Sequence, residues 1–261
     1  MAHKERLALL ISGGGTTMAE MIDAIHDKRR PHLGKRIEIV AVIASKLGIE
    51  GIDKARARDI PDKDIVVIDP GDYRGPDGEK SQDLFGNRLA EELRAREVTV
   101  FTQNGWLPTT PVMVALGWRG YNQHPGDPRD FGGIYGKQVH AAALHFSDQL
   151  ERDVPTFAVA QEVSPQVDGG AIVLYESIMM PKPTLEDKAL VGEEAEERFK
   201  QRVGELQQTV LPREHAIQVM LLERIALRNV ERIGMPRVVF PGEEGIRDRA
   251  KELAVQRFPH G

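Results

Sequence analysis

The sequence predicts an α/β protein, with a mostly parallel sheet that carries helices on both faces and a helical C-terminal extension. Three observations predict this fold class. Short apolar runs alternate with helical stretches through the first half, a glycine-rich loop follows the first run, and a long charged helical region fills the end. Strands that alternate with helices form parallel sheets, in which ligands bind beyond the carboxyl ends of the strands. Polar residues that directly follow an apolar run are therefore the candidates for a site.

The first half divides into four strands and four helices. The apolar runs predict strands at 7–11, 37–44, 65–68 and 98–101. The periodic stretches between them predict helices at 16–26, 51–59, 81–96 and 111–116. Leu84, Leu89 and Leu93 mark the expected apolar side of the third helix. Glycine or proline closes several of these segments, which fits the turns that parallel strands require.

The second half predicts one further strand, at 174–181, and then mainly helix. Pro181 and Pro183 open a helical region at 184–232 that we expect to be interrupted near Pro212. A closing strand is expected at 235–240 and an amphipathic helix at 245–258. The sequence shows neither a repeat nor a low-complexity linker, so we expect one domain at 1–235 and an extension at 236–261.

Composition narrows the classes of function. The chain has 261 residues, enough to bury a sizeable core, and a formal net charge of −5. This charge, with an isoelectric point of about 5.9, disfavours nucleic-acid binding dominated by phosphate contacts. The absence of cysteine excludes disulfides and thiolate metal sites. No signal-like segment or run of 18 apolar residues is present, so we expect a cytoplasmic protein with no membrane partner.

The loop after the first expected strand reads Ser12-Gly-Gly-Gly-Thr-Thr-Met18. Consecutive glycines let backbone N–H groups converge, and a helix N-terminus favours anions. The loop matches neither Gly-x-Gly-x-x-Gly nor the Walker A sequence, so dinucleotides and nucleoside triphosphates are disfavoured. Phosphate binding is the preferred interpretation, and an ordinary glycine turn with a threonine N-cap is the alternative.

A carboxamide, an imidazole and a carboxylate form the second group of candidates. Asn122 and His124 are two residues apart, so their side chains share one face of an extended segment, and Pro125 favours that conformation. Asp168 precedes two glycines, which allow a carboxylate to approach a ligand closely. These three groups suit the transfer of a carbonyl carbon between amines. Asn-x-His alone is weak, because a turn with an incidental histidine is equally compatible with it.

Six motifs then occur in a compatible order, at Ser12–Met18, Ala44-Ser-Lys46, Asn104-Gly-Trp106, Asn122-Gln-His124-Pro125, Asp168-Gly-Gly-Ala-Ile-Val173 and Glu214-His-Ala-Ile217. Together they make the chain resemble the formyltransferase family, over about residues 6–235, and most closely its members that act on glycinamide ribonucleotide. The resemblance implies the Rossmann-like formyltransferase fold. It also implies formyl transfer from 10-formyltetrahydrofolate, as a co-substrate, to an amine in purine biosynthesis, without a metal.

The same resemblance assigns roles to individual residues. Asn122, His124 and Asp168 would be the catalytic trio, with Asn122 donating to the tetrahedral oxyanion, His124 assisting proton transfer and Asp168 orienting His124. Gly15, Thr16 and Thr17 would hold the phosphate of the acceptor, and Glu214 would contact its ribose hydroxyls. The remaining positions, at the folate pocket, are Trp106, Leu107, Pro108 and Val167.

Several positions depart from the family pattern and loosen the identity of the acceptor. Thr17 replaces an asparagine, and Gly126-Asp127-Pro128 shortens the turn after His124 and makes it more acidic. Trp106–Thr110 lacks the basic residue that the family uses at the folate. Outside the motifs, His140 and His145 are five residues apart, which does not suit a metal site on one helix face, so we expect structural or surface roles for both.

Three alternatives to a glycinamide ribonucleotide transferase stay open. A formyltetrahydrofolate hydrolase would use the same trio with water, although such enzymes usually carry an extra N-terminal domain and this chain begins with the catalytic strand. A formyltransferase could act on another amine, such as an amino sugar nucleotide or an aminoacylated acceptor. A folate- or nucleotide-binding protein could keep the fold without catalysis. Small-molecule partners are expected in each case, no nucleic acid is expected, and a homodimer is left open.

Overall fold

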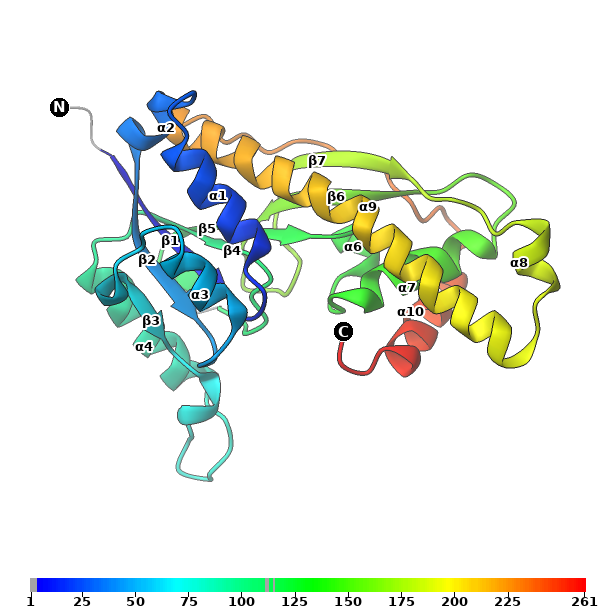
Figure 1. Ribbon diagram of the computed structural model, residues 1–261. Coiled ribbons are helices and arrows are strands. Elements are labelled where there is room, and N and C mark those ends of the chain that lie inside the picture. The colour runs from blue at the N-terminus through cyan, green and yellow to red at the C-terminus, as the bar shows by residue number, and fades with distance from the viewer. Residues whose placement is uncertain (1–3, 111–112, 115) are drawn as a thin grey trace. The chain divides into compact units, whose positions relative to one another are not determined.

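The computed structural model describes residues 4–110, 113–114 and 116–261, and it contains a seven-stranded sheet of order β3-β2-β1-β4-β5-β6-β7 (Figure 1). The strands are β1 Glu5–Ile11, β2 Ile37–Ala44, β3 Ile65–Val67, β4 Val100–Gln103, β5 Arg119–His124, β6 Pro155–Glu162 and β7 Ile172–Met179. The pairs β1–β2, β1–β4, β2–β3 and β4–β5 are parallel. The predicted α/β class with a mostly parallel sheet is confirmed.

The helices fill the connections between the strands and the C-terminal part of the chain. They are α1 Thr16–His26, α2 Pro31–Arg36, α3 Glu50–Arg56, α4 Gln82–Ala95, α6 Pro128–Phe131, α7 Lys137–Asp148, α8 Leu185–Ala189, α9 Gly192–Leu227 and α10 Glu244–Arg257. Two short 3₁₀ turns, η1 Asp62–Asp64 and η2 Pro70–Asp72, flank β3. The predicted C-terminal helix is thus present as α10, within one residue at each end.

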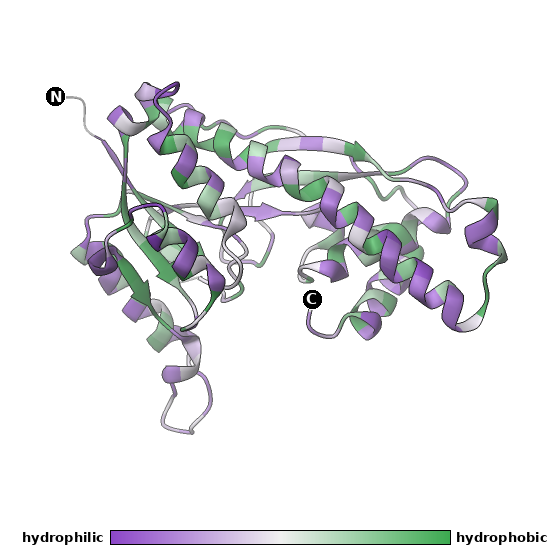
Figure 2. Ribbon diagram, viewed as in Figure 1, coloured by the Kyte–Doolittle hydropathy of each residue, from purple (hydrophilic) through white to green (hydrophobic). Residues whose placement is uncertain are grey.

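Burial explains why β1 and β2 were predicted almost to the residue. Both strands are apolar along nearly their whole length, and residues 7–11 and 41–44 are fully buried. Figure 2 shows both strands as hydrophobic over most of their length, whereas α4 alternates hydrophobic and hydrophilic residues. A continuous apolar run is what a strand with both faces covered requires, and an alternating helix is half exposed.

Residue contacts group the chain into two compact units. The first unit comprises Met1–Gln123, Ala160–Val173 and Gln218–Arg232, and the second comprises His124–Val159, Leu174–Ile217 and Ile233–Gly261. In the first unit, β1 and β4 pack against α4 through a core that includes Leu10, Phe101 and Phe85. In the second unit, α10 packs along α7. The expected boundary at residue 235 stays a prediction.

Three details of the prediction are wrong. Pro212 lies inside the continuous helix α9, where Leu206, Val210 and Ile217 are buried, so that packing outweighs the loss of one backbone hydrogen bond. Residues 235–240 form no strand, because side chains occupy backbone carbonyls there, as Arg152 does at Val238. Leu84 is 47% exposed, and Phe85 takes the buried position.

The helix expected at 111–116 falls partly on residues 111, 112 and 115, which lie outside the described residues. No helix in the described part of the chain combines the length and apolar character needed to span a bilayer.

Candidate active site

The loop between β1 and α1 is shaped by backbone packing against α3. Gly15 has φ +64°, and a Cβ built on it would lie 2.7 Å from Cα of Gly51, in the first turn of α3. The amide of Gly51 donates to the carbonyl of Gly13 at 3.1 Å. Glycine is therefore required at position 15 both by its conformation and by the close approach of α3. The expected loop-to-helix junction is present as predicted.

The same loop has the features of an anion site. Gly15 is the N-cap of α1 and provides no side chain to cap the first N–H groups of that helix. The Lys54 ammonium, from α3, donates to the Gly14 carbonyl at 2.8 Å and to Glu50 at 2.8 Å. Thr16 is exposed, whereas Thr17 is buried. Of the two threonine hydroxyls, only that of Thr16 belongs to an exposed residue.

The hydroxyl of Ser12 joins three loops that follow β1, β2 and β4. Ser12 Oγ accepts from the hydroxyl of Ser45 at 2.7 Å and from the backbone N–H of Leu107 at 3.0 Å. Three of the sequence motifs thus meet at one side chain, and two of them, the glycine loop and the segment after β4, are expected to hold different ligands. The backbone N–H of Leu107 is therefore already used, and Pro108 has none, so neither residue can donate a backbone hydrogen bond to a folate.

The segment 104–108 combines a packed indole with an exposed apolar residue. The Trp106 ring stacks on Phe85, with 6.2 Å between ring centroids, and its residue is 7% exposed. Leu107 is 57% exposed. The indole Nε1 of Trp106 and the Oδ1 of Asn104 are buried and have no hydrogen-bond partner among the described residues. Buried polar atoms of this kind are rare, and they suit a polar ligand that would complete them.

Asn122 and Asp168, which are 46 residues apart, are brought together. The carboxamide Nδ2 of Asn122, on β5, donates to Asp168 Oδ1 at 3.4 Å. Gln161, at the end of β6, donates to the same oxygen at 3.0 Å, and its residue is 1% exposed. Two amide donors on one oxygen fix the orientation of the carboxylate. Sequence reasoning missed Gln161, although a lone glutamine directly after the apolar run Phe157-Ala-Val-Ala160 was a usable signal.

The turn that carries Asp168 has an unusual backbone conformation and packs closely against the end of β6. Asp168 has φ +53°, an unusual conformation for a residue with a side chain. A side chain on Gly170 would collide with the backbone of Glu162, so the second glycine of the motif is needed there. Val167, the predicted neighbour of the folate, is 55% exposed on the same turn. Strain of this kind is common at functional sites and is consistent with the assignment.

His124 is the last residue of β5 and belongs to the second unit, where it is 4% exposed. Its Nδ1 lies 3.2 Å from the carbonyl oxygen of Gly126. A carbonyl only accepts, so this contact is a hydrogen bond when Nδ1 carries the proton, and the neutral ring then has its lone pair on Nε2. Burial, and next the charge of His124, lower the pKa of His140 to about 4. His140 is therefore a neutral, buried imidazole of α7.

Glu214 lies inside α9 and is 6% exposed. Burial raises the pKa of its carboxyl to about 8, because the charged form is poorly solvated there. Near neutral pH the group is mainly protonated, so it can both donate to and accept from hydroxyl groups. The sequence did not indicate this protonation state, because burial of a glutamate in a charged helix cannot be read from its neighbours.

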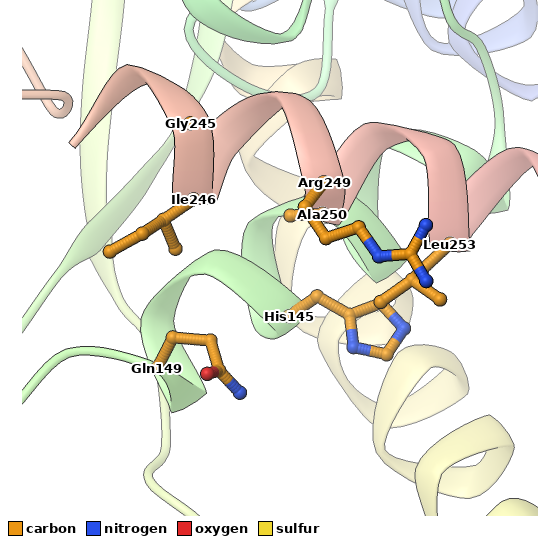
Figure 3. Close-up of a pocket in the computed structure, with 7 residues that line it drawn as sticks. All are labelled: His145, Gln149, Gly245, Ile246, Arg249, Ala250 and Leu253. Atoms are coloured by element: carbon orange, nitrogen blue, oxygen red, sulfur yellow. The ribbon is translucent and has the colours of Figure 1, made fainter.

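A pocket of the second unit lies outside these candidates. It is formed between the C-terminal end of α7 and the first three turns of α10, and its lining includes His145, Gln149 and Ile246 (Figure 3). The His145 ring stacks on Phe199 at 4.1 Å, which fits the structural role expected for it. Among the described residues, no group of three or more His, Asp or Glu side chains is arranged to hold a metal ion.

The chain was compared with known proteins. No protein-family model matches it. It is 28% identical, over 232 residues, to the trifunctional purine biosynthetic protein adenosine-3 of Drosophila pseudoobscura pseudoobscura, covering 88% of this chain but only 14% of that protein. It is 26% identical to a phosphoribosylglycinamide formyltransferase of Dictyostelium discoideum, over 75% of this chain and 91% of the relative. The predicted resemblance to formyltransferases, most closely to this branch, is confirmed.

Solved structures bear out the fold. A glycinamide ribonucleotide transformylase 1 from Symbiobacterium toebii superposes with a TM-score of 0.65 at 23% identity, covering 93% of each chain. A phosphoribosylglycinamide formyltransferase from Brucella melitensis gives a TM-score of 0.60 at 21% identity, covering 90% of this chain and all of the other. The sheet and its helices are therefore those of this fold.

Proposed function

We propose that this chain transfers a formyl group from 10-formyltetrahydrofolate to the amine of glycinamide ribonucleotide. The observation that carries the proposal is the Asn122–Asp168 contact, which joins two of the motifs that produced the family resemblance. The similarity to the Dictyostelium discoideum enzyme, over nearly its full length, supports the same reaction. The uncapped helix N-terminus after β1 and the buried polar atoms after β4 support the binding of a phosphorylated acceptor and of a folate.

In this mechanism the acceptor amine attacks the formyl carbon. Nδ2 of Asn122 has two hydrogens, so one can hold Asp168 while the other donates to the developing oxyanion. His124, with its lone pair on Nε2, takes up a proton from the attacking amine and can return it to the departing folate nitrogen. The C–N bond to folate then breaks, and the formyl group remains on the acceptor. Asp168, fixed by Gln161, supplies the negative charge that favours the protonated imidazole.

Acceptor recognition is assigned to the β1–α1 loop and to Glu214. The phosphate would lie on the N–H groups of Gly15, Thr16 and Thr17, and the Lys54 ammonium, which is paired with Glu50, holds the Gly14 carbonyl beside them. The ribose hydroxyls would bond to Glu214, which is mainly protonated near neutral pH. The donor would contact Trp106, Leu107, Pro108 and Val167, of which Leu107 and Val167 are exposed apolar residues suited to a pterin face.

The test is a mass-resolved assay of the purified protein with 10-formyltetrahydrofolate and a panel of amines. We expect formylated glycinamide ribonucleotide, and no product with amino sugar nucleotides. A control without acceptor separates the transferase from a hydrolase, which would release formate at the same rate in the absence of any amine. Binding of both ligands without turnover would favour a non-catalytic binding protein. Formylation of a different amine would support formyl transfer as the reaction and would show that glycinamide ribonucleotide is not the acceptor.

A further inference from the structure

The turn after His124 is where the chain departs from the family pattern, and it is packed against α7. A Cβ on Gly126 would lie 2.8 Å from Cγ1 of Val139 and 3.9 Å from the ring of His124. The carbonyl of Gly126 is the group that Nδ1 of His124 contacts. The position of one peptide group therefore determines whether the imidazole has a partner for an Nδ1 proton.

The next residue ties this turn to the C-terminal arm, defined here as residues 235–261. Asp127 is 1% exposed, caps α6, and accepts two charged hydrogen bonds from Arg129, at 2.8 and 2.6 Å. The other side of the same guanidinium donates to the carbonyls of Met235, at 2.9 Å, and Pro236, at 2.7 Å. One arginine thus joins the turn to the arm, with a planar fork that lysine cannot reproduce.

Two more anchors connect the arm to the segment that follows. Gln138, 4% exposed in the first turn of α7, donates to the carbonyl of Phe258 at 2.7 Å and accepts from the N–H of Tyr135 at 3.3 Å. Lys251, on α10, donates to the carbonyl of Gly132 at 2.8 Å. The whole stretch from Asp127 to Gln138 is held at intervals by residues more than 100 positions away, and α10 packs along α7 beside it (Figure 1).

We infer that the C-terminal arm is a positioning element for His124, because it clamps the Gly126–Asp127 turn and so holds His124 in the Nδ1–H tautomer. Arg129 is the central positioning residue of this clamp. A tautomer with its lone pair on Nε2 is the form that can accept a proton from an attacking amine. The importance of the clamp for turnover rests on the proposed formyl transfer, whereas the tautomer itself is a property of the folded chain.

The test reads the imidazole nitrogens of the full-length protein by long-range ¹H–¹⁵N spectroscopy at mildly alkaline pH, with His124→Gln used to assign the signals. The wild-type protein should show His124 with its proton on Nδ1. In Arg129→Met the Nε2–H form should gain population, and kcat should fall about tenfold while KM for the acceptor stays within about twofold. Arg129→Lys, which keeps the charge beside Asp127, should lie between the two.

The matched control is Arg249→Met, which places the same substitution on α10 at an arginine paired with Glu252 on the exposed surface. It should leave both the tautomer and kcat unchanged. An Nε2–H tautomer in the wild-type protein would overturn the inference without any variant. So would a folded Arg129→Met or Arg129→Lys protein with wild-type tautomer, whatever its rate; if the methionine variant does not fold, the lysine variant decides. A wild-type protein that shows the tautomer but no formyl transfer would refute the proposed function and leave the clamp standing.

Discussion

Two glycines of the candidate site occupy crowded positions for different reasons. At Gly15, in the first unit, the crowding atom is the backbone Cα of another glycine, and φ is +64°. At Gly126, in the second unit, the crowding atom is a methyl group of the Val139 side chain. The first constraint is set by two backbones, so no single substitution nearby can relieve it. The second is set by a side chain, and trimming that side chain can relieve it.

This contrast extends to the groups around each glycine. The β1–α1 loop presents N–H groups, and its shape comes from the local sequence together with α3. The second unit contributes two buried side chains, His124 and Glu214, and burial raises the pKa of the Glu214 carboxyl to about 8. We therefore expect ligand binding at the β1–α1 loop to be insensitive to pH and to be lost when a substitution changes the shape of the loop. In the second unit, a substitution that adds volume should be tolerated when a neighbouring side chain is shortened, and stability should depend on pH.

The largest expected effect is at the proposed trio of Asn122, His124 and Asp168. His124→Ala should lower kcat about a hundredfold or more, because it removes general acid–base and oxyanion contributions together. Asn122→Ala and Asp168→Asn should have effects of similar size with the fold intact. Steady-state kinetics together with circular dichroism measure both properties. Near-normal rates in any two of the three folded variants would rule out the proposed mechanism.

A pH-dependent stability is expected from Glu214. Its pKa is 4.5 as the ordinary value and about 8 in the folded protein, so between these values the folded chain holds a proton that the unfolded chain has released. Stability from this group is complete below pH 4.5 and is lost as the pH rises through 8. Glu214→Gln should therefore match wild type near pH 4 and exceed its free energy of unfolding near pH 8 by roughly 3 kcal/mol, at about 1.4 kcal/mol per pKa unit and with part of the shift offset by relaxation around the charge.

Urea unfolding at both pH values checks this expectation. Glu194→Gln, an exposed position of the same helix α9, is the control and should follow wild type at both pH values. Parallel curves for wild type and Glu214→Gln would mean that the carboxyl is ionised and compensated in the folded state. The acceptor KM of the same variant tests the ribose contact independently of stability.

Acceptor binding at the β1–α1 loop should be lost when its backbone shape is changed. Gly15→Ala should raise the acceptor KM at least about tenfold and cost about 1–3 kcal/mol in the free energy of unfolding, because it combines a left-handed conformation with a backbone collision. Gly13→Ala is the matched control, since a Cβ there meets nothing within 4 Å. Inorganic sulfate should compete with the acceptor and not with the folate. Competition with the folate instead would assign the loop to the other ligand.

The sequence was sufficient for the parts of the molecule that depend on local pattern. The apolar runs located β1 and β2, and consecutive glycines located the β1–α1 loop, because burial and backbone freedom act on neighbouring residues. The sequence was not sufficient where the structure of a segment depends on side chains that are distant in the chain. The strand expected at 235–240 is absent because Arg129 and Arg152 take its carbonyls, and Gln161 gained its role only from Asp168 on a later turn. In the sequence, the shortened turn at Gly126 is only a departure from a motif. The structure shows that this turn packs against α7 and that Arg129 connects it to the C-terminal arm.

The smallest expected effect is at Gly126, and it distinguishes the side-chain constraint there from the backbone constraint at Gly15. Gly126→Ala should cost about 1–2 kcal/mol in the free energy of unfolding and lower kcat several-fold, because its methyl group must displace the Val139 side chain or shift the turn itself. Val139→Ala alone should also destabilise, through the cavity left in a fully buried position. The double variant should cost clearly less than the sum of the two, with a coupling of about 1 kcal/mol measured by a double-mutant cycle. Recovery of kcat in the double variant would locate the loss in the position of the turn. Additive costs would mean that the Val139 side chain is not what the alanine methyl group displaces, and the side-chain constraint at this turn would then be refuted. Gly15→Ala has no counterpart experiment, since Gly51 has no side chain to remove.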